Sequence, residues 1–508
     1  MHEILYIQAG SFANYIGTHF WNTQETYLSF EDPDNPNIQH DVSLKEIPGQ
    51  ATYCPRVLLF DRKANFGPLT KTNALGVKAV EGTIEDSLWT GNVHQHNQTA
   101  IRRSKYHLRL EETCGLGVEP NDDEHAYLLQ DSHEIRYWSD FSRVYYSPKS
   151  IQPVPNPMCG EQERDDWVGG SELFSRYNED TSLMEDSVRL FLEECDHFQG
   201  LHVVSDVDTF GGFTSAFLTT FRDEFSRASS LVVPILSCSS FHFAGTPDAR
   251  ASRAVVNDAY YLRSLSEFAS MSVPILSPTA WPLDSKSHLV NFDKNSIHQT
   301  SAIISTHLES STLPLRLYKS RITVPDYCAQ ATRYGAGPFC QLNGRVPVAI
   351  STAFDAQFNF SAADTECDVE EWNRVDVTRG FSPALLGKYD EWHQAANGRG
   401  TLVSSTHAFA YPLPSSYPAI FQDTDLVVSP YNGKNVPPAI SVLSSISNNN
   451  GMAKTFSAYA GYIQNMLRLG LPSVGSETDE LRELINDLWT LHDCYPGDQS
   501  YANDEEID

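Results

Sequence analysis

The sequence predicts an α/β fold: a mostly parallel sheet with helices on both faces, then a mixed domain and a helical C-terminal part. Short unbroken apolar runs occupy residues 4–7, 57–60, 201–204 and 231–236. Such runs are typical of strands that are covered on both faces. Amphipathic helical patterns alternate with the runs, as they do in parallel sheets. The length of 508 residues allows roughly three domains of about 150 residues each.

The first apolar run leads through a tight turn at Ala9-Gly10 into a predicted helix. Ser11 is placed to cap this helix. The apolar residues of the helix recur every four positions and form one stripe, at Phe12, Ile16 and Phe20. Residues 31–50 are polar and contain three prolines, so they predict a loop. The second strand ends at Asp61, and residues 63–68 predict its exit loop.

The middle of the chain begins with a segment of different composition. Residues 148–182 are rich in proline, glycine and charge, which favours an insertion or linker. A helix is predicted over 183–197, before the third strand. After that strand, residues 209–214 predict a glycine-containing turn, and the next helix carries an aromatic stripe at Phe217, Phe221 and Phe225.

The pattern becomes mixed from about residue 340 onward. Residues 346–351 resemble a strand, residues 453–469 predict a helix, and 477–508 predict an acidic amphipathic helix followed by a tail. We therefore expect three domains, with bounds 1–265, 266–450 and 451–508.

Composition limits the classes of partner and compartment. The formal net charge of −29 disfavours nucleic acid and direct docking on anionic lipid, because both need clustered Lys and Arg. The nine cysteines form no CxxC pair, which favours reduced thiols over a disulfide frame or a zinc site. No apolar run reaches the roughly 18 residues of a membrane helix. Lys45 is the only basic residue among the first 50, unlike an Arg-rich mitochondrial presequence.

Three segments resemble tubulin. EILYIQAGSFANYIGTHFW (3–21) resembles the opening strand, first phosphate loop and helix of tubulins. YCPRVLLFD (53–61) resembles their second strand, and FQGLHVVSDVDTFGGFTSAF (198–217) lies where tubulins carry a strand and a glycine-rich loop. The resemblance implies a tubulin-like, Rossmann-type fold that holds a nucleotide at the carboxyl edge of the sheet.

A closer resemblance is to the Misato family, tubulin relatives linked to mitochondrial distribution and inheritance. It rests on YWSDFSRVYYSPKSI (137–151), EECDHFQG (193–200) and TSAIISTHLESSTLPLRL (300–317). It covers residues 2 to about 320 and assigns residues 1–115 to a Misato segment. The resemblance implies a role in mitochondrial partitioning.

The tubulin resemblance also implies a nucleotide or phosphate site. Tubulin-type proteins hold phosphates on backbone N–H groups of glycine loops at helix N-termini. The residues that would form a residual site here are Gly10, Ser11, Asn14, Asp61, Lys63, Gly211 and Gly212. This chain departs from the pattern with Phe12 and Ala13 in the first loop and with Phe210 and Phe213 around the glycine pair. We therefore expect no resident cofactor, with GTP or GDP as the ligand if the site still binds one.

Catalysis is expected to be lost. Tubulins place two acids near the metal, and this chain has Asp61 followed by Lys63. Magnesium prefers carboxylate oxygens and water to an ammonium group, and phosphoryl transfer depends on charge neutralisation by the metal. We expect no catalytic residue and no metal ligand. A bound phosphate, if any, is expected to bind without magnesium and to depend on Lys63.

Each of these residues also has a purely structural interpretation. Ser11 can be a helix cap, and the glycine pair can serve a tight turn. Asp206-Val207-Asp208 has the DxD pattern of some metal sites, but two acids at the end of a strand are expected to be caps. Phe12, Phe210, Phe213 and the Tyr137-Trp138 pair are expected to fill the core. His94-Gln95-His96 has the spacing of metal ligands but no third partner, so we expect a solvated loop.

Three functions remain open from the sequence. The first is a non-hydrolysing tubulin-like protein that acts in mitochondrial distribution, morphology and inheritance, through proteins of the mitochondrial surface or the cytoskeleton. The second is an active GTPase that self-associates like tubulin. The third is an unrelated α/β enzyme, for which no GxSxG, HExxH or GxGxxG motif is found. The expected location is the cytoplasm and the outer mitochondrial surface, reached through protein contacts. The candidate contacts are the acidic tail and the C-terminal helix with its leucines at 481, 484, 488 and 491. For these leucines, packing on the protein itself is the favoured interpretation.

Overall fold

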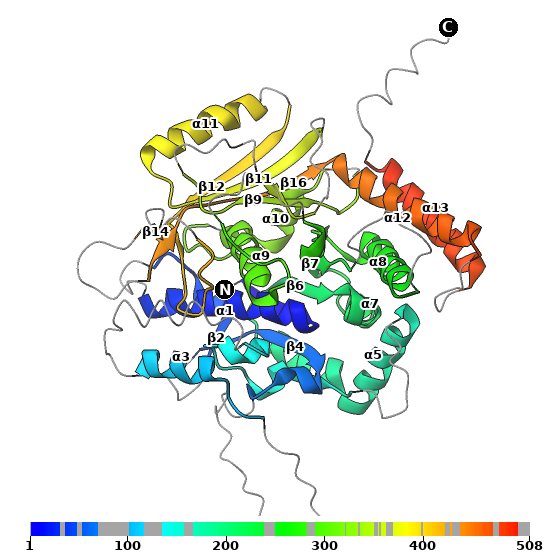
Figure 1. Cartoon of the computed structure of the whole chain (residues 1–508), viewed down its shortest axis with the longest axis horizontal. Coiled ribbons are helices and arrows are strands. Elements are labelled where there is room, and N and C mark those ends of the chain that lie inside the picture. The colour runs from blue at the N-terminus through cyan, green and yellow to red at the C-terminus, as the bar shows by residue number, and fades with distance from the viewer. Residues whose placement is uncertain are drawn as a thin grey trace, which may run out of the picture.

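The structure is a computed structural model of the whole chain (Figure 1). It describes residues 2–30, 36–47, 53–69, 101–115, 135–156, 166–237, 249–281, 290–320, 322–333, 336–349, 354, 357–361, 369–397, 400–421, 427–428, 437–470 and 477–495.

The N-terminal part is built on a six-stranded sheet with the order β5-β4-β1-β6-β7-β8, in which all neighbours are parallel. The strands are β1 (Glu3–Ala9), β4 (Val57–Arg62), β5 (Ile151–Val154), β6 (Phe198–Asp206), β7 (Ser229–Ile235) and β8 (Met271–Ser272). The four apolar runs of the sequence are therefore β1, β4, β6 and β7. Their predicted parallel arrangement is confirmed.

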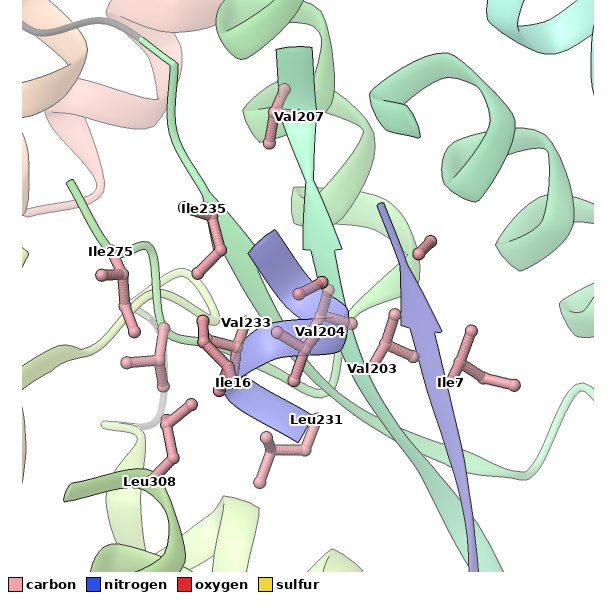
Figure 2. Close-up of a cluster of buried hydrophobic side chains, with 14 of the residues drawn as sticks. Ile7, Ile16, Val203, Val204, Val207, Leu231, Val233, Ile235, Ile275 and Leu308 are labelled. Atoms are coloured by element: carbon pink, nitrogen blue, oxygen red, sulfur yellow. The ribbon is translucent and has the colours of Figure 1, made fainter. Parts of the chain in front are cut away.

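Helices cover both faces of this sheet. On one face lie α1 (Ser11–Phe30) and α9 (Ile297–Ser311), and Figure 2 shows Ile16 and Leu308 from these helices beside Val204 and Val233 of the sheet. On the other face, Phe213 of α7 (Val207–Glu224) packs against Phe60 of β4, with ring centroids 5.2 Å apart. Because side chains alternate along a strand, each buried strand supplies apolar groups to both layers.

Residues 148–182 and 31–50 differ from the sequence prediction. Residues 148–182 do not form an insertion or linker where the structure describes them. They supply the edge strand β5 and helix α5 (Trp167–Thr181), which packs on α7. The predicted loop at 31–50 contains β2 (Leu44–Glu46), which pairs with β3 (Tyr53–Pro55). Both segments are polar in overall composition, but each contains residues that pack on a neighbouring element.

The second domain contains a mixed sheet with the order β10-β9-β16-β11-β12. Its strands are β9 (Gln341–Arg345), β10 (Phe358–Asn359), β11 (Glu371–Arg379), β12 (Leu402–Ala408) and β16 (Val442–Asn449). β11 and β12 are parallel and are joined by α11 (Pro383–Asn397), whereas the other pairs are antiparallel. The strand expected at 346–351 is wrong for the described residues 346–349, because β9 ends at Arg345, and residues 350–351 lie outside the described part of the chain.

The remaining elements complete the two domains. They are α3 (Lys105–Gly115), α6 (Arg189–Glu193), α8 (Ala249–Phe268), α10 (Val324–Ala331), β13 (Tyr411–Pro412), β14 (Val427–Val428) and β15 (Ala439–Ile440). The helix expected at 183–197 is a π-helical turn, Leu183–Val188, followed by α6.

The C-terminal helices α12 (Gly451–Arg468) and α13 (Thr478–Asp493) pack on each other and on α8 (Figure 1). Both were predicted. Leu481, Leu484 and Leu488 of α13 are fully buried and Leu491 is half-buried, so the leucine face of this helix packs on the protein itself. Among the described residues, no helix combines the length and apolarity needed to span a membrane.

A buried ionic cluster joins α1, α9 and the second sheet. Glu309 of α9 accepts hydrogen bonds from Arg379 Nη1 at 2.5 Å and from Arg316 Nη2 at 3.1 Å. The Tyr27 hydroxyl of α1 also donates to Glu309, at 3.1 Å, and accepts from Arg379 Nη2 at 2.9 Å. Since Arg379 is the last residue of β11, one carboxylate holds the first helix, α9 and the second sheet together.

Candidate functional site

The candidate site lies at the carboxyl ends of the neighbouring strands β4, β1 and β6. Asp61 is near the end of β4, Gly10 follows β1, and Asp206 ends β6. Asn14, in the first turn of α1, donates from Nδ2 to the Phe60 carbonyl at 3.0 Å. Ligands of open parallel sheets bind at this edge, so the fold brings these four residues to the expected place.

The N-terminus of α1 is occupied by the carboxylate of Asp206. Its Oδ2 accepts the backbone N–H of Phe12 at 2.7 Å, and its Oδ1 accepts that of Ala13 at 2.8 Å. These two N–H groups lack partners within the helix and would otherwise be available to an anion. Asp206 therefore caps α1, a helix that is distant from it in sequence. Asp206, and not Ser11, has the capping role that was expected of Ser11.

Gly10 makes this contact sterically possible. Its φ of +105° lies in the region that favours glycine, and a Cβ atom there would approach Asp206 Oδ2 to 2.4 Å. The glycine of the first loop is thus needed here for close approach of a side chain of the same protein. A phosphate at the same N–H groups would compete directly with Asp206.

The electrostatics of Asp206 reflect two opposing effects. The carboxyl group points into the protein, although the residue as a whole stays partly exposed. Burial raises the pKa of Asp206 to about 8, the hydrogen bonds from Phe12 and Ala13 oppose this rise, and the nearby Asp61 adds to it. The partial positive charge of the α1 N-terminus favours the ionised form.

Asp61 is fully enclosed by donors. Its Oδ1 accepts the Arg62 N–H at 2.8 Å and Asn65 Nδ2 at 2.8 Å. Its Oδ2 accepts Trp138 Nε1 at 3.3 Å and Asn14 Nδ2 at 3.4 Å. Burial raises the pKa of Asp61, and these four donors oppose the rise. The carboxylate is therefore engaged in holding β4, α1 and the Trp138 segment, and its oxygens face protein donors.

Two of the predicted site residues lie outside this cluster. Lys63 is exposed in the short 3-10 helix Lys63–Phe66, and Ser11 is a half-buried residue at the start of α1. No hydrogen bond joins either side chain to Asp61 or Asp206 in the described part of the chain.

The predicted glycine turn at 209–214 is wrong. β6 ends at Asp206 and α7 begins at Val207, so Gly211 and Gly212 lie inside the helix. A Cβ on Gly212 would come within 2.2 Å of the Trp167 carbonyl oxygen. On the facing helix α5, a Cβ on Gly170 would lie 3.1 Å from the Gly212 Cα. The glycine pair therefore permits close packing of α5 on α7 and forms no loop around a phosphate.

Aromatic side chains complete the filling of this region. Phe210 and Phe213 are buried, and Phe213 contacts Phe174 of α5 as well as Phe60. Trp138 is also buried, and Phe12 is half-buried against the core. The core role predicted for Phe210, Phe213 and Trp138 is confirmed.

The other candidate groups give no further site. His94-Gln95-His96 and the tail after Tyr495 lie outside the described residues. In the part of the chain that the structure describes, no three His, Cys, Asp or Glu side chains come together in a way that could hold a metal ion.

Sequence reasoning weighed Asp206 as a metal ligand or a cap, and preferred the cap. It missed that the capped helix is α1, and it missed the contact of Trp167 with the glycine pair. An aspartate directly at the end of a buried strand was the available signal for the first. No local signal existed for the second, because Trp167 lies far from Gly212 in the sequence.

Comparisons with known proteins agree with this fold. A family model described as a Misato Segment II tubulin-like domain matches residues 2–112, and one described as a Tubulin domain matches residues 129–317. Protein DML1 of Gibberella zeae is 30% identical over 83% of this chain and 86% of its own length. Protein dml1 of Aspergillus clavatus is 28% identical over the full length of both chains. Protein dml1 of Schizosaccharomyces pombe is 28% identical over 63% of this chain and 67% of its own length.

The match to the Gibberella protein covers most of both chains at 30% identity, and this match together with the two family models establishes the family. The chain belongs to the Misato (Dml1) family of tubulin-like proteins.

Proposed function

We propose that this chain is a non-hydrolysing tubulin-like protein that acts in mitochondrial distribution and inheritance through protein partners. The observation that supports loss of hydrolysis is the carboxylate of Asp206 on the first N–H groups of α1. A nucleotide phosphate at this position would have to displace the tethered carboxyl group of Asp206 and would then lie beside a second carboxyl group, Asp61. Both effects oppose binding of a polyanion.

The mitochondrial role is supported by the family membership alone. Within the molecule, the leucine face of α13 packs internally, so we infer that partners contact other surfaces.

The first experiment measures equilibrium binding of fluorescent GTP and GDP, with and without magnesium, together with release of phosphate from GTP. We expect no saturable binding at up to about 100 μM nucleotide, which corresponds to a binding free energy weaker than about 5.5 kcal/mol. Magnesium-dependent turnover that is abolished by Asp61→Ala would contradict the proposal and establish instead the active GTPase of the alternative.

A matched pair of variants tests the role assigned to Asp206. In Asp206→Ala the two N–H groups of α1 lose their acceptor, so inorganic phosphate is expected to bind and to raise the melting temperature by mass action. Asp208→Ala removes a partly exposed carboxylate two residues away and serves as the control. Equal phosphate effects on wild type, Asp206→Ala and the control would show that Asp206 does not occupy an anion position.

The same assay examines Lys63. If phosphate binds to Asp206→Ala through Lys63, the double variant with Lys63→Glu loses the phosphate effect. An unchanged effect would remove Lys63 from the site, in agreement with its exposed position.

The proposed location is tested by fractionation. Because the proposal assigns the protein to the outer mitochondrial surface, it should leave mitochondria in high salt or carbonate and be digested by added protease while the outer membrane is intact. Protection from protease inside intact mitochondria would contradict the proposal.

A further inference from the structure

A cavity of about 340 Å³ lies in the second domain, on a different sheet from the candidate site. It is formed by the ends of β11 and β12, the start of α11, and two short segments next to the bridge between Ile38 and Leu317. Its lining residues are Pro36, Asn37, Leu317, Lys319, Thr378, Phe381, Leu386, His407, Ala408 and Phe409. The volume falls within the range of about 300–1,000 Å³ that is typical of small-molecule sites.

The position of the cavity follows from the topology of the second sheet. β11, α11 and β12 form the parallel strand–helix–strand unit of the second domain. Thr378 and His407 lie one residue before the ends of the two strands, and Phe381 follows β11. The cavity therefore opens at the carboxyl edge of a parallel pair, the edge at which α/β sheets bind ligands.

The walls of the cavity are mainly apolar. Leu317, Phe381, Leu386 and Phe409 are all half-buried. Phe381 belongs to the apolar cluster under α11, whereas Leu317 and Phe409 belong to the cluster around Val377. The cavity is thus lined by apolar groups from two hydrophobic clusters, one under α11 and one in which Val377 of β11 packs with Tyr27 of α1.

The charged side chain among the described lining residues is Lys319. His407 adds an imidazole, and the described part of the lining contains no Asp or Glu. This is a marked contrast in a chain with a formal net charge of −29. The His407 ring is held by a 2.7 Å hydrogen bond between its Nδ1 and the Thr378 hydroxyl. Its position is therefore fixed by the strand beside it, while Lys319 is an exposed side chain at the rim.

We propose that this cavity binds a small amphipathic anion, with an aromatic or short aliphatic body and one acidic group. The body packs against Leu317, Phe381 and Phe409, and the acidic group lies beside Lys319. Apolar walls with one or two placed polar groups are the usual composition of such sites, and the positive rim selects an anion against the negative charge of the remaining protein.

The test uses two fluorescent probes that share an apolar body. Anilinonaphthalene sulfonate carries the anionic group, and N-phenylnaphthylamine lacks it. Binding of each probe to the folded full chain is titrated in wild type, in Lys319→Gln and in Leu386→Trp, which fills the cavity. Lys149→Gln, an exposed lysine on the first domain, is the control for general charge.

We expect one sulfonate per chain, a threefold to tenfold weaker affinity in Lys319→Gln, and no saturable binding in Leu386→Trp. The neutral probe should bind wild type and Lys319→Gln equally and should also be excluded by Leu386→Trp, while Lys149→Gln matches wild type throughout. Circular dichroism and melting curves confirm that each variant is folded. Sulfonate binding that survives both cavity variants, or a loss on Lys149→Gln as large as that on Lys319→Gln, would overturn the proposal.

Discussion

Two sheet edges in this molecule are formed by the carboxyl ends of parallel strands, and they differ in what occupies them. At the first, β4, β1 and β6 end on Asp61, Gly10 and Asp206, and the space is filled by side chains of the same chain. At the second, β11 and β12 end beside a cavity of about 340 Å³ with a positive rim. The same topological position is closed in the domain that resembles a nucleotide-binding fold and open in the other.

The difference shows what a strand edge needs in order to bind a ligand. Topology supplies exposed strand ends and a helix N-terminus in both places. At the first edge the exposed N–H groups have an acceptor in Asp206, and the carboxyl of Asp61 has four donors. At the second edge apolar groups remain half-buried. The two edges have the same topology, so what distinguishes them as ligand sites is whether side chains of the same chain already occupy the strand ends.

The largest expected effect comes from separating the two regions. Glu309→Gln removes the carboxylate between Arg316 and Arg379, which are buried. Leaving buried charges without their partner costs about 3–5 kcal/mol, so we expect a loss of this size in the free energy of unfolding, measured by urea denaturation. Glu25→Gln breaks a more exposed pair with Arg143 and should cost less than about 1 kcal/mol. Equal losses would contradict the joining role of Glu309.

The closed packing beside the first edge is tested at Gly212. Gly212→Ala introduces a Cβ about 2.2 Å from the Trp167 carbonyl oxygen, and overpacking of this kind costs about 1–3 kcal/mol. Gly461→Ala in α12 is the matched control, because nothing lies within 4 Å of its Cβ position. There the higher helix propensity of alanine should stabilise by about 0.5–1 kcal/mol. We expect the free energy of unfolding to fall in Gly212→Ala and to rise in Gly461→Ala. Stabilisation by both substitutions would show that α5 moves to accommodate the added methyl group.

The state of the first edge should depend on pH. The pKa of Asp206 is about 8 in the folded protein, against about 3.9 in an unfolded chain. Between these values the folded protein holds a proton that the unfolded chain has released, so stability falls as pH rises through this window, by at most about 1.4 kcal/mol per unit. In Asp206→Asn this contribution is absent. The free energy of unfolding should therefore decrease less between pH 5 and 8 than it does in wild type.

The control for this measurement is Asp390→Asn, an exposed carboxyl on α11, which should keep the wild-type dependence. A slope that is the same in wild type and Asp206→Asn would mean that Asp206 is already ionised throughout the range.

The smallest effect is expected at Lys63. Its side chain is exposed, and substitutions at such positions usually change stability by less than about 0.5 kcal/mol. Lys63→Glu should therefore melt like wild type. A larger loss of stability would mean that the Lys63 side chain contributes to the packing of the first edge. It would then not differ from Lys319, at the second edge, in the way proposed here.

The strands of the first sheet could be predicted from the sequence because fully covered strands need unbroken apolar runs. The glycine pair could not be placed correctly. Glycines after a buried strand usually indicate a turn, but Gly211 and Gly212 lie in a helix because α5 needs a close approach there. The segment of α5 itself was read as a linker, since its polar face dominates its composition.

The closure of the site was visible only in part. The loss of small residues at Phe12 and Phe213 predicted a damaged phosphate loop, and Phe213 does fill the core. The partner of the Phe12 N–H is 194 positions away along the chain, so no local pattern could reveal it. The cavity of the second domain likewise collects short segments from four parts of the sequence.

A carboxyl group that belongs to the polypeptide cannot dissociate from it, whereas a bound nucleotide can be hydrolysed and exchanged. Hydrolysis and exchange move a nucleotide-binding protein between two states. Asp206 accepts the first N–H groups of α1 as part of the same chain. Under the proposed function the protein is therefore expected to keep one conformational state, and its activity is expected to depend on its abundance and on its partners.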